Sequence, residues 1–286
     1  MKKRVILINL CIIILISNIP VYAQKLNPLL QYKIEISGNY NPMFLSNKMY
    51  MVNNSFLQEY DFKTNKIRKI LKLDYKNLSG CYNPYLRRVN NKIFIFLLEK
   101  IICIDYKTKK TIWEKSFALN YFIEPQIAEN IIIISQLGNP YEIIAINEAN
   151  GNIIWKFSPE DDYLISAFAV KQNNCYVFTG LKRLFIIDIA NGNVKNICKL
   201  PISILTIFPT NDQIFIIDPG KVSRIAALNL NGIVESEQSI DGQLMSIFRN
   251  NSKIYTLSSN KTINCFTKDL KKVWSVPLNK DIRPYY

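Results

Sequence analysis

Few side chains in this sequence could carry out covalent chemistry or hold a metal ion. Histidine is absent, which excludes Ser-His-Asp and Cys-His nucleophiles and every imidazole metal ligand. The nine glycines form no phosphate-binding loop. The only acidic cluster is Glu160-Asp161-Asp162. Its carboxylates could bind calcium, although a solvated loop is the simpler interpretation. We therefore expect no catalytic residue, no metal site and no cofactor.

The N-terminus predicts export. A basic start at residues 2–4 precedes an apolar run of about a dozen residues and a plausible cleavage site at Ala23. We interpret residues 1–23 as a signal peptide and residues 24–286 as one exported domain, periplasmic or extracellular. An uncleaved membrane anchor is the alternative. No small residue directly precedes Cys11, so no lipid anchor is expected, and no later segment approaches the length of a membrane span.

The chain is strongly basic, with a formal net charge of +14. Such a charge could attract anionic partners. However, no block of five like charges occurs, and the densest lysine runs, 107–110 and 268–272, fall at predicted turns. We interpret the lysines as a solvated surface, with a face for an anionic ligand as the alternative. No nucleic-acid partner is expected.

The three tryptophans, Trp113, Trp155 and Trp274, stand at equivalent points of a repeat of about 41 residues. In its two best copies, 103–113 and 145–155, a small residue is followed two positions later by Asp or Asn, then by a polar turn and the tryptophan. Weaker copies begin their turns at residues 61, 188, 229 and 267. Cys103 and Cys265 both occupy the small position, which indicates core packing rather than chemistry.

Each copy of the repeat contains the signals of four short strands. A polar turn rich in Asn precedes a β-branched or aromatic run, as in Asn90-Asn91-Lys92 before residues 93–96. Pro42, Pro84 and Pro125 mark the start of an earlier strand. No helical pattern intervenes. Four short strands in each repeat of about 41 residues predict an all-β fold. This fold is a β-propeller of four-stranded antiparallel blades that bury one another's faces.

The number of blades stays open. Six repeats are visible in the sequence. Residues 32–36 resemble the last strand of a blade, and residues 283–286 resemble the opening of one. This pattern is compatible with a complete six-bladed ring and with a seven-bladed ring that is truncated at its C-terminal end.

The pattern of small residue, Asp or Asn, polar turn and Trp resembles the tryptophan-docking repeat (the PQQ-like repeat) of quinoprotein-like propellers, over residues 43–278. That family includes PQQ-dependent alcohol dehydrogenases and the non-catalytic outer-membrane assembly factors of the BamB type. The family's enzymes carry an adjacent Cys-Cys pair, which this sequence lacks. The resemblance therefore implies a non-catalytic scaffold that binds a protein, peptide or glycan partner in the cell envelope. A propeller enzyme that uses carboxylates is the alternative, and the oligomeric state stays open.

Two sets of candidate residues follow. A tryptophan at a fixed point of a repeat is typical of a wedge between blades. The predicted blade-docking residues are Trp113, Trp155, Trp274, Asp105, Asn147, Gly151, Asp188 and Gly192. Tyrosine joins an apolar body to a polar tip, which suits a binding surface. The predicted ligand-binding residues, in loops between blades, are Tyr40, Tyr82, Tyr121 and Tyr163. Covering the blade ends is the alternative role for these tyrosines.

Overall fold

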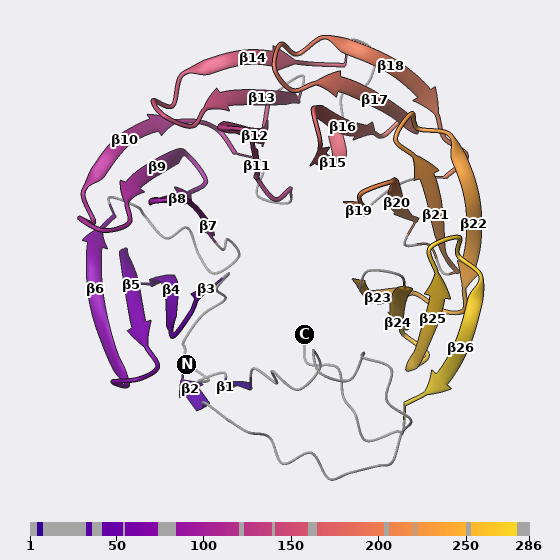
Figure 1. Ribbon diagram of the computed structural model, residues 1–286, viewed down its shortest axis with the longest axis horizontal. Coiled ribbons are helices and arrows are strands. Elements are labelled where there is room, and N and C mark those ends of the chain that lie inside the picture. The colour runs from indigo at the N-terminus through magenta and orange to yellow at the C-terminus, as the bar shows by residue number, and fades with distance from the viewer. Residues whose placement is uncertain are drawn as a thin grey trace.

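Six four-stranded antiparallel sheets follow one another along the chain and stand around a common centre (Figure 1). The computed structural model describes residues 5–7, 33–35, 42–53, 55–73, 84–119, 123–138, 141–159, 165–202, 206–218, 220, 222–249 and 253–278. Within each sheet the strands lie in chain order, with the first strand nearest the centre and the fourth at the rim. The prediction of an all-β propeller with four-stranded antiparallel blades is confirmed.

The blades are numbered here in chain order. Blade 1 comprises β3 (Met43–Leu45), β4 (Lys48–Asn53), β5 (Phe56–Asp61) and β6 (Lys66–Lys72), and blade 2 comprises β7 (Tyr85–Val89), β8 (Lys92–Phe96), β9 (Lys100–Asp105) and β10 (Thr111–Ser116). Blade 3 comprises β11 (Gln126–Ala128), β12 (Ile131–Gln136), β13 (Glu142–Asn147) and β14 (Ile153–Phe157), and blade 4 comprises β15 (Ile165–Lys171), β16 (Asn174–Thr179), β17 (Arg183–Asp188) and β18 (Val194–Lys199). Blade 5 comprises β19 (Thr206–Pro209), β20 (Gln213–Asp218), β21 (Ser223–Asn229) and β22 (Val234–Ile240), and blade 6 comprises β23 (Leu244–Arg249), β24 (Lys253–Ser258), β25 (Thr262–Thr267) and β26 (Lys272–Pro277).

A separate two-stranded pair joins β1 (Val5–Leu7) to β2 (Lys33–Glu35). Apart from β1, the predicted signal peptide lies outside the described residues.

Polar residues in the left-handed region close the turns between strands. Asn90, between β7 and β8, has a φ of 52°, and Asn130, between β11 and β12, has a φ of 64°. Asn tolerates this conformation better than most residues, which is why the Asn-rich runs mark turns. The turn after the first strand also holds the turn after the third, since the Asn130 carbonyl accepts the Glu148 N–H. Both turns therefore lie at one face of the ring.

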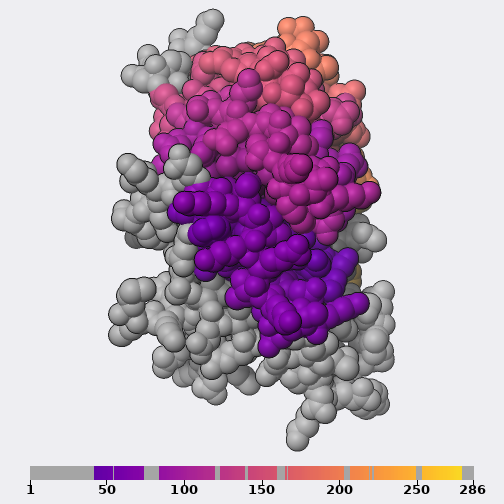
Figure 2. Space-filling model, turned by 90° about the vertical axis from the view of Figure 1, so that its left-hand side faces the viewer, coloured from indigo at the N-terminus to yellow at the C-terminus, as the bar shows by residue number. Residues whose placement is uncertain are grey.

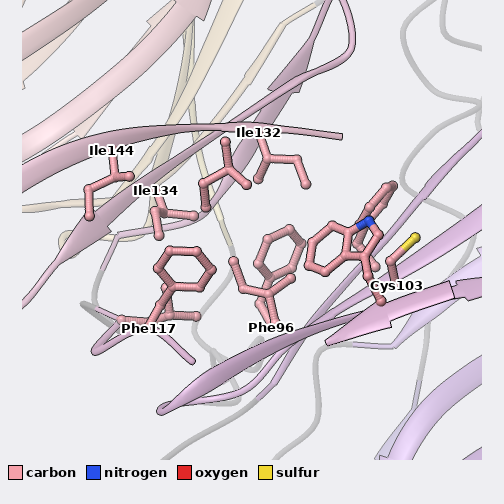
Figure 3. Close-up of a cluster of buried hydrophobic side chains, with 11 residues drawn as sticks. Phe96, Cys103, Phe117, Ile132, Ile134 and Ile144 are labelled. Carbon is pink, nitrogen blue, oxygen red and sulfur yellow. The ribbon is translucent and has the colours of Figure 1, made fainter. Parts of the chain in front are cut away.

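The hydrophobic core lies in layers between neighbouring blades. The middle strands β8, β12 and β13 are buried along most of their length, on both faces. Figure 3 shows one layer, in which Phe96, Cys103 and Phe117 of blade 2 lie across from Ile132, Ile134 and Ile144 of blade 3. Burying each large apolar side chain contributes about 1.5–3 kcal/mol, so contact between blades stabilises the ring. Seen from the side, blades 1 to 3 form a continuous surface (Figure 2).

A β-bulge interrupts the pairing between the third and fourth strands in blades 2 to 6. In blade 2, Cys103 pairs with Trp113 but the next pair joins Ile104 to Thr111, so Ile112 is the extra residue. In blade 3, Ala145 pairs with Trp155 and Ile146 with Ile153. A bulge re-aims the side chain that follows it. Here it sets the direction of the residue at the tryptophan position of each blade.

Candidate functional site

The tyrosines predicted to bind a ligand, Tyr40, Tyr82, Tyr121 and Tyr163, all lie outside the described residues, and so does the Glu160-Asp161-Asp162 cluster. In the part of the chain that the structure describes, no group of three or more Cys, Asp or Glu side chains is arranged to hold a metal ion. The candidate site within the described residues is therefore the set of joints between blades, where the tryptophan position of one blade meets the turn of the next.

The cysteines of the described blades are packing residues with suppressed acidity. Cys103, Cys175 and Cys265 are buried, and they are not in disulfide bonds. Burial raises the pKa of the Cys103 thiol to about 12 and also raises that of Cys175. The thiolate is the reactive form of cysteine, so these thiols are poor nucleophiles at neutral pH. Cys103 instead supplies the small side chain beneath Trp113, its partner across the strands.

Trp113 joins blade 2 to blade 3. Its Nε1–H donates a hydrogen bond of 3.0 Å to the Glu148 carbonyl, in the turn after β13. Its ring lies against Gly151, where a Cβ atom would be 2.8 Å from the ring. Gly151 has a φ of 74°, so glycine is required both for the left-handed backbone and for the close approach.

Trp155 joins blade 3 to blade 4 in the same way. Its Nε1–H donates a hydrogen bond of 2.7 Å to the Ile189 carbonyl. Gly192 has a φ of 78°, and a Cβ there would be 2.8 Å from Trp155 Cγ. Trp113 and Trp155 are each 8% exposed. Each tryptophan thus fills a slot made by the glycine turn of the next blade.

Side chains at the start of these turns hold the turn backbone in shape. Asp105 Oδ1 accepts hydrogen bonds from the Lys107 and Thr108 N–H groups, Asn147 Oδ1 from Ala149, and Asp188 Oδ1 from Ala190. These are Asx turns, in which the side chain replaces a backbone acceptor. The Thr108 backbone bond lowers the pKa of Asp105, and the Lys195 ammonium, 2.8 Å from Asp188, lowers that of Asp188.

Asp188→Asn is expected to make the melting temperature less sensitive to acid. The pKa of Asp188 is lowered below 3.8 in the folded protein. Its contribution to stability is therefore present above about pH 4 and lost as the pH falls through the folded pKa. Asparagine keeps the turn, as Asn147 does in blade 3, and at pH 7 loses only an exposed ion pair, about 1 kcal/mol or less.

The measurement is the melting temperature of both proteins from pH 7 to pH 3. Asp188→Ala serves as the control, because it removes the turn hydrogen bonds and should destabilise the protein at every pH. An unchanged acid profile for Asp188→Asn would contradict the role assigned to the Asp188 carboxylate.

Two joints lack the tryptophan of the Trp–Gly pair, and the first of them keeps its glycine, Gly232, with a φ of 83°. Between blades 4 and 5, Asn196 stands at the tryptophan position and donates to the Asn231 carbonyl at 3.1 Å. Between blades 5 and 6, Ser236 stands at that position. Leu270 then occupies the glycine position, with a φ of 58° and 2% exposure. In the joint between blades 5 and 6, small Ser236 replaces the tryptophan and large Leu270 replaces the glycine.

The joint between blades 1 and 2 is polar. Buried Glu59 stands where the other blades have an uncharged, apolar residue, and it accepts hydrogen bonds from Lys48 at 2.8 Å and from Tyr50 at 2.5 Å. Lys109 occupies the glycine position, 3.9 Å from Glu59. Burial acts to raise the pKa of Glu59, but the bonds from Lys48 and Tyr50 outweigh it, and the net pKa is lowered. This network was not predicted from the sequence, although Glu59 and Lys109 place charges at two positions of the repeat that are uncharged in the copy at 145–155.

Trp274 differs from the other two tryptophans. It is 41% exposed, and Val276, two residues later on β26, is 50% exposed. Its ring contacts Tyr255 at 5.9 Å between centroids. Blade 6 stands at one end of the arc of described blades, and no described sheet follows it (Figure 1). The tryptophan of blade 6 therefore lacks a described turn of a next blade to dock into.

Several apolar side chains on the same face of blade 6 are also partly exposed, although Cys265 at its centre is fully buried. Along β24 the side chains alternate, with Ile254, Thr256 and Ser258 buried and the residues between them only partly buried. Residues that pair directly across strands lie on the same face of a sheet. The pairing of β24, β25 and β26 places five apolar side chains together. We call them the Trp274 face: Tyr255, Leu257, Ile263, Trp274 and Val276.

Comparison with known proteins supports the fold and the repeat. Residues 90–201, which contain both buried Trp–Gly joints, match the family model described as outer membrane protein assembly factor BamB. A search of curated proteins gives no match. Residues 90–201 are thus BamB-like β-propeller repeats.

Solved structures show the same architecture. The chain is similar to BamB from Moraxella catarrhalis, with a TM-score of 0.62 and 14% identity over 87% of this chain and 80% of that chain. It is also similar to Hsv2 from Kluyveromyces lactis, with a TM-score of 0.65 and 9% identity over 87% of this chain and 90% of that one. The computationally designed protein Ika8 matches with a TM-score of 0.60 and 10% identity over 82% and 73%. At these identities the structures share the fold alone.

Proposed function

We propose that this protein is an exported, non-catalytic propeller scaffold that binds a protein partner in the cell envelope. The observation that carries the proposal is the match of residues 90–201 to BamB-like repeats. A protein described as an assembly factor acts by contact with other proteins. A peptide or a glycan would use the same kind of surface, and the experiment below separates these partners.

The chemistry of the described blades supports binding over catalysis. The conspicuous polar side chains of the joints, Glu59 and Asp188, are engaged in hydrogen bonds and ion pairs that hold blades and turns in place. The buried thiols have raised pKa values. The Trp274 face, by contrast, presents apolar side chains to solvent. Exposed apolar clusters of this kind mark interaction surfaces. Tyr40, Tyr82, Tyr121 and Tyr163 are proposed as further contacts with the partner.

The envelope location rests on the sequence of residues 1–23 and on the BamB-like repeats. In the part of the chain described by the structure, no helix has the length and apolar character needed to cross a membrane.

Cross-linking in the native cell tests the function. The full chain carries a C-terminal tag, cells are fractionated, and amine cross-linked protein adducts are identified by mass spectrometry. Glycans, most of which carry no amine, are scored separately by pull-down from periodate-treated and untreated envelopes. We expect a chain that begins after Ala23, in the envelope fraction, cross-linked to another envelope protein. A chain that keeps its N-terminus and stays in the cytoplasm, or one that gives no protein adduct in the envelope, would contradict the proposal.

A further inference from the structure

Trp274 has the same local strand pairing as the two buried tryptophans, Trp113 and Trp155. It pairs with Cys265, as Trp113 pairs with Cys103 and Trp155 with Ala145. In each case the tryptophan follows a bulge and stands opposite a small, fully buried side chain. The sixth blade therefore presents the donor half of a joint, an indole with its N–H and a flat ring, on a face that is partly open to solvent.

The turns that receive the two buried tryptophans share a simple form. Asn147 or Asp188 begins the turn, the next residue supplies the carbonyl that accepts the indole N–H, and glycine with positive φ stands at the fifth position. The missing Cβ lets the ring approach to a distance that a side chain would block. A group that fills the Trp274 face in the same way must offer such a turn.

A lysine beside the Trp274 face indicates that the partner carries a negative charge there. Lys92, the first residue of β8, reaches across the joint to Glu148, the second residue of the receiving turn, at 3.0 Å. Lys253 begins β24 at the equivalent place, since it pairs with Thr267 as Lys92 pairs with Asp105. Lys253 lies on the same face of β24 as Tyr255 and Leu257, whereas Lys268 lies 3.4 Å from Asp212 of blade 5. A carboxylate at the second position of the partner's turn is therefore favoured.

A second copy of this chain fits the face poorly. The only first-blade surface that could follow blade 6 in a ring contains Met49, Met51 and Tyr60, which are 0%, 2% and 6% exposed. That surface is already covered. Placing two Trp274 faces together would instead bring two lysine-rich blades into contact, which is electrostatically unfavourable.

We propose that the Trp274 face binds a β-hairpin of a partner protein, through a turn of the form Asn/Asp-Glu-x-x-Gly. The indole N–H of Trp274 donates to the carbonyl of the Glu, its ring covers the glycine, and Lys253 pairs with the Glu carboxylate. The partner thereby completes a joint like that between blades 2 and 3. This inference rests on the proposed function, because it specifies the class of protein that the scaffold binds.

A peptide tests the recognition. The probe is a cyclised, fluorescently labelled peptide with the sequence of residues 143–157, which contains Asn147, Glu148 and Gly151. Cyclisation is needed because an isolated hairpin is only marginally stable. The full-length protein is titrated into the peptide, and anisotropy gives the dissociation constant. We expect Trp274→Ala to weaken binding at least about tenfold, as for an aromatic anchor. Trp274→Phe, which keeps a ring but loses the donor, should weaken it roughly threefold to tenfold.

A charge reversal provides the matched control. A peptide with Glu148→Lys should bind weakly to the original protein, and Lys253→Glu in the protein should restore its binding. Because Trp274 is 41% exposed, Trp274→Ala should lower the melting temperature much less than Trp155→Ala does and should stay folded at the temperature of the titration, which separates lost binding from lost folding. Equal affinity of all the variants, or the absence of charge rescue, would overturn the inference.

Photo-cross-linking in cells separates this inference from the proposed function. Benzoylphenylalanine replaces Val276, on the face, or Val222, which is 57% exposed on blade 5. An adduct that joins position 276 to a β-hairpin of another envelope protein supports the inference. Adducts at 222 but not at 276, or an adduct at 276 with this chain itself, overturn the inference and leave the scaffold function standing. No protein adduct at 276, at 222 or in the amine cross-linking overturns both.

Discussion

Replacing Trp155 by alanine is expected to lower the free energy of unfolding by about 3–5 kcal/mol, as for other large buried aromatic side chains. Trp155 is 8% exposed, its ring covers Gly192, and its N–H is bonded to the Ile189 carbonyl. The substitution leaves a cavity between blades 3 and 4 and an acceptor without its donor. Urea denaturation followed by circular dichroism measures the loss.

Trp274→Ala is the matched control, because it makes the same chemical change at the same position of the repeat. Its ring is 41% exposed, so the loss should be about 1–2 kcal/mol, clearly smaller than the loss for Trp155→Ala. Equal losses for the two variants would show that the joints do not depend on docked tryptophans, or that Trp274 is covered in solution.

Gly192→Ala is also expected to destabilise the protein strongly. The backbone at Gly192 has a φ of 78°, and a non-glycine residue in this region costs about 1–2 kcal/mol. The added Cβ would lie 2.8 Å from Trp155 Cγ. Overpacking of this kind adds about 1–3 kcal/mol. Denaturation of the variant measures the combined loss.

A double mutant separates these two causes. In Trp155→Ala/Gly192→Ala the new methyl group enters space that the indole has left, so the combined loss should be smaller than the two single losses together. Gly220→Ala controls for the loss of a glycine as such, since a Cβ there would meet its nearest atom at 3.4 Å. Strict additivity of the two joint variants would contradict direct contact between Trp155 and Gly192.

The blade architecture could be predicted because it depends on local signals that recur. Polar turns with positive φ end the first strands of blades 1 to 4, and the run from Ile131 to Ile134 is apolar throughout because blades cover both of its faces. The positions of Trp113 and Trp155 in the repeat led to the two joints in which the structure places them, opposite Gly151 and Gly192. The period of the repeat and the residue types within it were sufficient to predict these features.

Other features depend on what lies across a joint, which no local pattern contains. Between blades 5 and 6, Ser236 replaces the tryptophan of one blade and Leu270 the glycine of the next. The two changes compensate in side-chain volume, but they lie on different blades, so neither predicts the other from its own segment. Burial of Glu59 depends on Lys109 of the next blade. The exposure of Trp274 is of the same kind, because its residue type and register equal those of Trp155 and only its surroundings differ. The tyrosine loops lie outside the described residues.

Hydrogen exchange of the indole N–H groups, followed by NMR, tests the central claim most directly, because the three tryptophans give three separate signals. In the free protein, Trp113 and Trp155 should exchange slowly, since both N–H groups are buried in hydrogen bonds, and Trp274 should exchange fast. Addition of the unlabelled cyclised 143–157 peptide to 15N-labelled protein, so that the peptide's own tryptophan gives no signal, should slow Trp274 alone. Slow exchange of all three signals in the free protein, or fast exchange of Trp274 with the peptide at saturation, would contradict an open face that receives a partner's turn.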